Sequence, residues 1–224
     1  KLTSESIYVG KFEVTNQLYH HFIGETGQLN HASKNLNWAG NIKYPFRLIR
    51  NYSKHEDYFN YPVVNISRES AIEFCKWLTI KYNSFEKKKL GNITFQLPTE
   101  KQWENFAKVN LINSSLFSKR KYLRNSKGVF LCNYNPVEER WILDSDKDFL
   151  KPGLTKEQIR EAGKLDGFEF TCPVDSYFKN EYELYCIYGN VSEMVLNKPI
   201  SKGGSWASFR NEIIVKSDEK FFTP

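Results

Sequence analysis

The sequence has no run of 18 apolar residues, so its 224 residues predict no membrane-spanning helix. It also lacks the patterns GxGxxG and GxxxxGK[ST], so no common nucleotide-binding motif is present. The Lys and Arg residues are interleaved with Asp and Glu, as in KNEYE and KSDEK. The net charge of +6 therefore predicts a mixed, solvated surface, and no nucleic-acid partner is expected.

Histidine and cysteine are scarce. The four histidines lie in the first quarter of the chain, and none is spaced from a carboxylate as metal ligands are. The four cysteines, Cys75, Cys132, Cys172 and Cys186, form no CxxC or zinc-like pattern. A histidine metal site is therefore not predicted. A Ser-His-Asp triad stays open, because sequence alone does not bring such residues together.

Apolar residues make up 40% of the chain, which is enough to bury a core. No internal repeat, low-complexity tract or Gly/Ser linker divides the sequence. The simplest interpretation is one α+β domain over residues 1–224. Because the chain opens with Lys1, we expect any signal peptide or lipid anchor to lie outside it.

Three helices are predicted from capping residues followed by an apolar stripe. The first begins at Thr15 or Asn16, and the second is capped by Ser67. In the third, Thr99 and Gln102 form a capping box. The residues predicted to face the core are Leu18, Tyr19, Phe22 and Ile23, then Ala71, Phe74, Cys75 and Leu78, then Trp103, Phe106 and Ala107.

Regular patterns fade between residues 109 and 195, where short apolar pieces alternate with Asn, Asp, Gly and Pro. One amphipathic stretch, Leu154 to Gly163, predicts a short surface helix that ends at its glycine.

Five segments follow one another in the region from Phe12 to Trp206, namely EVTNQLY, PVVNISRESAIEFCKWL, LPTEKQWENFA, PVDSYFKNEYELYCIYGNVSEM and KGGSW. In this order they resemble the blocks of the formylglycine-generating enzyme (sulfatase-modifying factor) family. The resemblance implies a C-type-lectin-like variant fold, which is α+β with little regular secondary structure. The family typically closes with a Gly-Phe-Arg strand, whereas this chain stops at FFTP, so we expect a domain cut short at its C-terminus.

The enzymes of this family oxidise a substrate cysteine to formylglycine with two copper-binding cysteines. Carried over to this sequence, these cysteines fall on Ser208 and Ile213. Neither residue replaces a thiolate, the soft ligand that Cu(I) prefers. The resemblance therefore predicts no copper, no formylglycine synthesis and no catalytic residue. Ser205, the GGS serine, is expected to belong to the Gly203-Gly204 turn.

The family also binds structural Ca²⁺ at two loop sites. The resemblance assigns the first site to the side chains of Asn133 and Asp166 and to the carbonyls of Tyr134 and Phe168. Such hard oxygen ligands suit Ca²⁺. A plain Asp-Gly turn at Asp166 is the alternative interpretation.

The second calcium site corresponds to GNVSE. The resemblance assigns it the carbonyls of Gly189 and Val191 and the carboxylate of Glu193. Its first ligand position holds Cys186, and a thiol is a poor Ca²⁺ ligand. We therefore expect a weakened second site, with Glu193 paired to a nearby Lys or backbone N–H as the alternative.

Cys132 and Cys172 each flank a segment of the first calcium site. If an ion closes that loop cluster, the two thiols lie near each other, and the resemblance leads to the hypothesis of a Cys132–Cys172 disulfide. Such a bridge fits an oxidising compartment. Two independent buried thiols are the alternative.

The motifs GNVSEMV and KGGSW resemble those of non-catalytic members of the family, the Bacteroidetes lipoproteins of gliding motility and type IX secretion. This implies an exported domain at the periplasm or outer-membrane surface, a structural or interaction component whose partners are other envelope proteins. A diverged oxidoreductase of the same fold and a lectin-like glycan-binding module are the alternatives. A redox enzyme would need soft or imidazole metal ligands in the segment Ser205 to Ile213. A glycan binder would show an exposed tryptophan, either Trp206 or Trp141.

Overall fold

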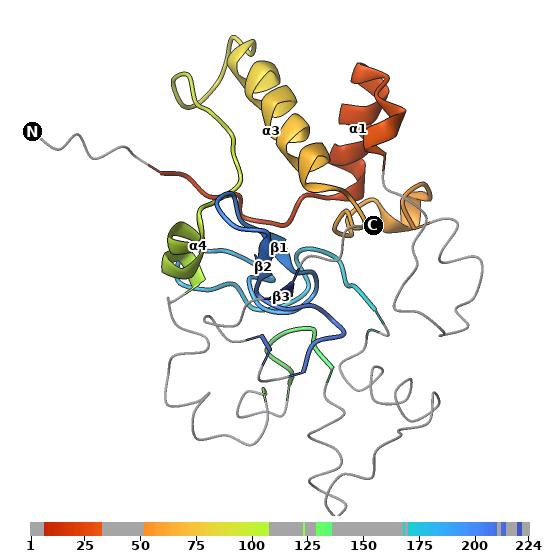
Figure 1. The fold of residues 1–224 in the computed structure, drawn as a ribbon, viewed down its shortest axis with the longest axis vertical. Coiled ribbons are helices and arrows are strands. Elements are labelled where there is room, and N and C mark those ends of the chain that lie inside the picture. The colour runs from red at the N-terminus through yellow and green to blue at the C-terminus, as the bar shows by residue number, and fades with distance from the viewer. Residues whose placement is uncertain are drawn as a thin grey trace, which may run out of the picture.

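The computed structural model describes residues 7–32, 52–107, 123, 129–135, 168, 170–209, 212–213 and 219–220 (Figure 1). Helices come first and short strands last, with long irregular segments between them. The elements are α1 (Asn16–Thr26), η1 (Leu29–His31), η2 (Glu56–Tyr58), α3 (Arg68–Asn83), α4 (Glu100–Ala107), β1 (Glu193–Met194), β2 (Ile200–Lys202) and β3 (Glu219–Lys220). The α+β class with little regular secondary structure is confirmed.

Helices α1 and α3 begin at the predicted caps. Thr15 Oγ1 accepts a hydrogen bond of 3.2 Å from the Leu18 N–H, and Ser67 Oγ accepts one of 3.1 Å from the Ser70 N–H. These side chains satisfy N–H groups that have no partner within the helix. Gly27 ends α1 in the left-handed conformation, with φ at 65°.

The two helices lie side by side at one end of the molecule and bury an aromatic cluster between them (Figure 1). Tyr19, Phe22 and Phe74 are almost completely buried, and the rings of Phe22 and Phe74 meet edge to face at 5.7 Å. The prediction for Leu18 is wrong, because its side chain is 37% exposed. The buried stripe of α1 is therefore narrower than the periodicity predicts.

Helix α4 carries the predicted capping box. The Thr99 N–H donates to Gln102 Oε1 at 2.8 Å, and the Gln102 N–H donates to Thr99 Oγ1 at 3.3 Å. Trp103 and Ala107 are 1% exposed and anchor α4 in the main core. The buried members of this core are Trp103, Ala107, Leu123, Phe130, Cys132, Tyr134, Leu184, Ile187, Tyr188, Val195 and Ile213.

The three short strands form one antiparallel sheet in the order β1-β2-β3. Glu193 pairs with Lys202, and Ile200 pairs with Lys220. The pairing places the end of the GNVSE loop against the start of the GGSW turn.

Within the described ranges, no helix is long and apolar enough to cross a membrane. The predicted helix from Leu154 to Gly163 falls outside the described residues.

Candidate functional site

Asn190 lies in the GNVSE loop and is completely buried. Its Nδ2 donates to Glu13 Oε2 at 2.7 Å and to the Cys172 carbonyl at 3.3 Å. Its Oδ1 accepts from the Cys172 N–H at 2.8 Å and from Asn133 Nδ2 at 3.3 Å. Its backbone carbonyl accepts from the Trp206 N–H at 2.9 Å. All four hydrogen-bonding positions of the amide are therefore used, and one side chain joins segments from both ends of the chain.

Gly189 makes the close approach that this arrangement requires. It forms a parallel bridge with Asn133, and a Cβ atom at position 189 would lie 1.9 Å from the Asn133 carbonyl oxygen. Its φ of 70° also favours glycine. The turn therefore has a packing role that needs no cation.

Two segments of the predicted first calcium site lie next to each other. Asn133 is 2% exposed, and its Nδ2 donates to the Phe170 carbonyl at 2.7 Å, which ties residues 129–135 to the segment after Phe168. Tyr134 is buried in the main core, and the Phe168 ring packs against Tyr177. Asp166 lies outside the described residues. The described part is thus compatible with a shared ion.

The residues of the second predicted site make hydrogen bonds within the protein. Gly189 donates its N–H to the Gly203 carbonyl at 2.8 Å, and Val191 donates its N–H to Glu13 Oε1 at 3.3 Å. The Glu193 carboxyl group accepts a hydrogen bond from the Trp103 indole N–H. Neither a lysine nor a backbone N–H is therefore the partner found for Glu193. The residues described include no group of three or more His, Cys, Asp or Glu side chains that could hold a metal ion.

Glu13 is the buried acid that sequence reasoning missed. It is 9% exposed, and burial raises its pKa well above the ordinary value, with further contributions from Cys186 and Glu193. Burial also raises the pKa of Glu193 to about 7. Two acids with raised pKa values therefore lie near each other beneath the GNVSE loop. The only local signal was a glutamate three positions before the first residue of α1.

The two positions that correspond to the family's copper cysteines hold no copper ligand. Ser208 Oγ accepts a hydrogen bond of 2.9 Å from the Ser205 N–H and lies 3.2 Å from Ser205 Oγ. Ile213 is completely buried, and a Cβ at Gly204 would lie 2.3 Å from its Cγ2. The hydroxyl at 208 thus stabilises the GGSW turn, and the side chain at 213 fills the core beneath it. These residues do not fit a copper ion.

The predicted Cys132–Cys172 disulfide is wrong for this structure, in which all four cysteines are free thiols. Cys132 packs in the main core near Tyr188. Cys172 is also completely buried, so the two cysteines are separate buried thiols, as the alternative predicted. The physical reason is the hydrogen bonding of Asn190 to both backbone groups of Cys172, which holds that residue beside the 186–190 loop.

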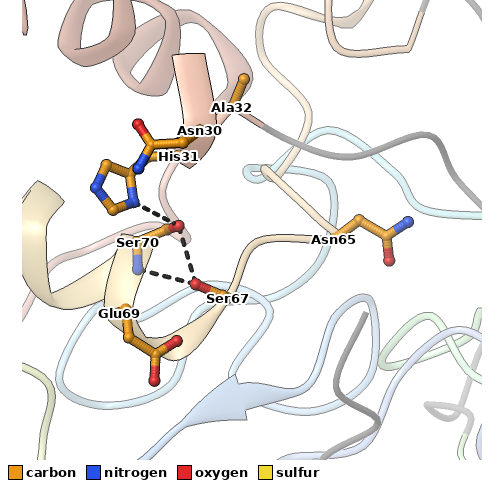
Figure 2. A pocket seen from close by; sticks show the side chains of 7 residues that line it. All are labelled: Asn30, His31, Ala32, Asn65, Ser67, Glu69 and Ser70. Atoms are coloured by element: carbon orange, nitrogen blue, oxygen red, sulfur yellow. Dashed lines mark hydrogen bonds between the residues drawn. The ribbon is translucent and has the colours of Figure 1, made fainter. Parts of the chain in front are cut away.

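A cavity of about 230 Å³ lies between η1 and the start of α3 (Figure 2). His31 Nδ1 lies 2.9 Å from Ser70 Oγ, and Ser70 Oγ lies 3.0 Å from Ser67 Oγ. Ser67 is the cap of α3, and Ser70 is 3% exposed. Glu69 also lines the cavity, but its side chain points away from His31 (Figure 2). The group is a capping network that fixes η1 on α3, and these contacts form no Ser-His-acid triad.

The capped helices, the irregular loops and the GGSW turn over a buried core define an α+β domain of the sulfatase-modifying type. Residues 1–221 match the family described as sulfatase-modifying factor enzyme 1-like domain, and the chain belongs to this family. It is 25% identical over 226 residues to the formylglycine-generating enzyme of Mus musculus, an alignment that covers 86% of this chain and 49% of the mouse protein. The chain thus spans about half the length of that relative.

Two solved structures are similar to this chain. One is PvdO from Pseudomonas aeruginosa, with a TM-score of 0.49 and 15% identity, covering 93% of this chain and 71% of PvdO. The other is CarF, with a TM-score of 0.47 and 18% identity, covering 89% of this chain and 74% of CarF.

Proposed function

We propose that this chain is a non-catalytic, exported domain that serves as a structural or interaction component of a bacterial envelope complex. The observation that supports the proposal is that neither position of the family's copper-binding cysteines holds a sulfur ligand. The Ser208 hydroxyl belongs to a turn, and the Ile213 side chain is fully buried in the core. A hard hydroxyl and an alkyl group cannot replace two thiolates for Cu(I).

An exposed apolar segment before α1 supports the interaction role. Ile7 and Tyr8 are 57% and 64% exposed. The rings of Phe12 and Tyr185 are tilted with their centroids 5.1 Å apart, and Lys11 Nζ lies 5.5 and 5.6 Å from the two ring centroids. Aromatic residues such as Tyr8 and Phe12 are enriched at protein interfaces relative to the rest of the surface.

Structural calcium at the first site belongs to the same proposal. The Asn133 amide and the carbonyls of Tyr134 and Phe168, together with Asp166, would hold the ion. An ion bound there would tie together two loop segments that have few ladder hydrogen bonds of their own. We expect a weaker second site, because the Cys186 thiol is a poor Ca²⁺ ligand and the Glu193 carboxyl group accepts a hydrogen bond from Trp103.

The absence of catalysis is tested with a sulfatase-derived peptide that contains the substrate cysteine, in the presence of copper and oxygen. We expect no formylglycine above a no-protein control, with the mouse enzyme as the positive control for the assay. Measurable turnover by this chain would contradict the proposal.

The interaction role is tested by native gel electrophoresis of detergent-solubilised envelopes, followed by detection of this protein. We expect it in a large assembly, and we expect Tyr8→Glu to release it. Ile80→Glu is the matched control, because Ile80 is 69% exposed but lies on α3. A wild-type protein that migrates as a monomer, or two variants that behave alike, would count against the exposed segment as an interface.

A further inference from the structure

The end of α3 and the loop that follows it, residues 80–93, carry exposed apolar and basic side chains together. We propose that this α3 tip binds the surface of an anionic phospholipid bilayer, with its apolar side chains inserted among the headgroups. The inference goes beyond the proposed function and does not rest on it, because it concerns a direct contact of this domain with lipid. Such a contact requires no membrane-spanning segment.

Two large apolar side chains of the α3 tip face the solvent. Ile80 lies in the last turn of α3 and is 69% exposed, and Phe85 follows the helix and is 67% exposed. The side of α3 that packs against α1 already carries its own apolar residues, among them the buried Phe74. Ile80 and Phe85 therefore add nothing to the core, and burial in the headgroup region would remove both from water.

The loop of the α3 tip is fastened by the residues that end the helix. The Tyr82 hydroxyl accepts a hydrogen bond of 2.9 Å from the Leu90 N–H. Asn83 Nδ2 donates to the Ile93 carbonyl at 2.9 Å, and Asn83 Oδ1 accepts from the Ile93 N–H at 3.0 Å. Lys88 Nζ donates to the Asn83 carbonyl at 2.9 Å. These bonds close the loop on itself while its phenyl ring stays outside.

The same loop is basic. Residues 81–93 contain one acid, Glu86, and four lysines, which are Lys81, Lys87, Lys88 and Lys89. Lys81 pairs with Glu25 of α1 at 2.8 Å, whereas Lys87 and Lys89 are exposed beside Phe85 in the sequence. Lysines that flank exposed apolar side chains complement the negative charge of anionic lipid headgroups.

The position of the α3 tip favours a bilayer over a protein partner. In Figure 1 the end of α3 and the loop after it project at the upper end of the described chain, away from α4 and the sheet. A fluid bilayer admits a projecting ring without a preformed pocket, whereas a protein partner would need one. Lipid bound at this end would also leave the GNVSE loop and the GGSW turn uncovered.

Flotation of the purified protein with vesicles tests the contact. We expect it to float with phosphatidylcholine vesicles that contain phosphatidylglycerol, and not with phosphatidylcholine alone. About 1 M salt should release most of it, because the screening length falls to about 3 Å. Binding to neither vesicle, or equally to both, would overturn the proposal. Retention on polyglutamate without flotation would also overturn it, because it would indicate an acidic protein partner.

Two charge-matched variants test the lysines. Lys87→Glu/Lys89→Glu should weaken vesicle binding at least about twentyfold, since each lysine near an anionic surface contributes about fivefold to the affinity. Lys54→Glu/Lys101→Glu makes the same change in net charge at two exposed lysines outside the α3 tip, and should have a much smaller effect. Equal losses in the two variants would show that net charge alone governs binding, which would overturn the assignment to the tip.

The inserted ring is tested with Phe85→Ser, which should weaken vesicle binding at least about tenfold. Leu29→Ser is the matched control, because Leu29 is 76% exposed but lies on η1, which meets the start of α3. Both side chains are exposed, so both variants should melt as the wild type does. If Phe85→Ser binds as the wild type does, the contact is electrostatic adhesion only and insertion is overturned.

Quenching by brominated lipid locates the ring directly. Phe85→Trp and Leu29→Trp each add one tryptophan to the same five native ones. We expect vesicles with brominated acyl chains to quench Phe85→Trp more strongly than Leu29→Trp. Equal quenching would overturn the proposed orientation. In detergent, Ile80→Glu should leave any protein assembly intact, because detergent removes the bilayer that the α3 tip binds.

Discussion

Glu13 Oε2 accepts a hydrogen bond of 2.7 Å from Asn190 Nδ2, although 177 positions separate the two residues. The same carboxylate accepts from the Val191 N–H at 3.3 Å. The segment before α1 is therefore fastened to the loop before β1. Because Asn190 also holds Cys172 and Asn133, its removal affects four segments at once.

Replacing Asn190 with glycine should lower the free energy of unfolding by at least about 3 kcal/mol. Glycine keeps the left-handed backbone, with φ at 59°, but removes the four side-chain hydrogen bonds. The buried groups that bonded to the Asn190 side chain therefore lose that partner. Urea denaturation measures the change. The exposed Asn92→Gly should change stability by less than about 1 kcal/mol, so equal effects would argue against the central role of Asn190.

Gly189→Ala should destabilise the protein by more than about 3 kcal/mol or prevent folding, because the new Cβ would meet the Asn133 carbonyl oxygen. Gly27→Ala is a close control, since Gly27 has a similar φ of 65° but no atom within 4 Å of the added Cβ. That variant should lose only about 1–2 kcal/mol from the left-handed backbone. Similar melting temperatures for the two variants would show that the Gly189–Asn133 contact is not this close.

Lys202→Ala should lower the free energy of unfolding by about 3 kcal/mol, because it leaves two carboxylates without their buried cation. The Lys202 side chain is completely buried, and its Nζ lies 3.2 Å from Glu104 and 3.6 Å from Glu100. Lys202→Met keeps most of the packing volume and should cost less. Denaturation of both variants, with the exposed Lys101→Ala as control, separates the charge from the packing. A larger loss for Met than for Ala would contradict this account.

In the presence of a chelator, the free energy of unfolding should fall as the pH rises from about 4.5 to about 7. The Glu193 pKa is about 7 in the folded protein against an ordinary 4.5, so the folded state binds more protons in this window. The slope is at most about 1.4 kcal/mol per pH unit for this group, and the raised pKa of Glu13 adds to it.

The Glu193→Gln variant keeps an oxygen that can accept from the Trp103 indole but removes the titrating group. Its stability should therefore depend less on pH across the same window. A wild-type stability that rises between pH 4.5 and 7 would show that neither carboxyl group is held in its neutral form.

Chelation should lower the melting temperature, and Ca²⁺ should restore it better than Mg²⁺, which requires tighter octahedral geometry. Binding to the folded state alone stabilises by roughly 2.7 kcal/mol at a hundredfold excess over Kd. Asp166→Ala should abolish the response, and Glu193→Ala should leave most of it. A Ca²⁺ response that survives in Asp166→Ala would place the metal elsewhere.

The three helices and their caps followed from the sequence, because capping and apolar periodicity depend on residues three or four positions apart. Thr15, Ser67 and Thr99 each cap the helix that follows, as predicted. The error at Leu18 has a different origin. Its exposure depends on how α1 meets α3, which the periodicity within α1 does not specify.

The sequence by itself thus determined the helix starts, the order of the family's blocks, and the loss of sulfur ligands at Ser208 and Ile213, because residue identity and short spacings are sufficient for each. Only the tertiary structure decided that Glu13 contacts Asn190, that Trp103 holds Glu193, and that the Asn190 side chain binds both backbone groups of Cys172. These contacts lie between irregular segments, where no repeating pattern sets which side chains meet. Their partners are chosen by the close approach of Gly189 to Asn133 and by the hydrogen bonds that the buried Asn190 must satisfy.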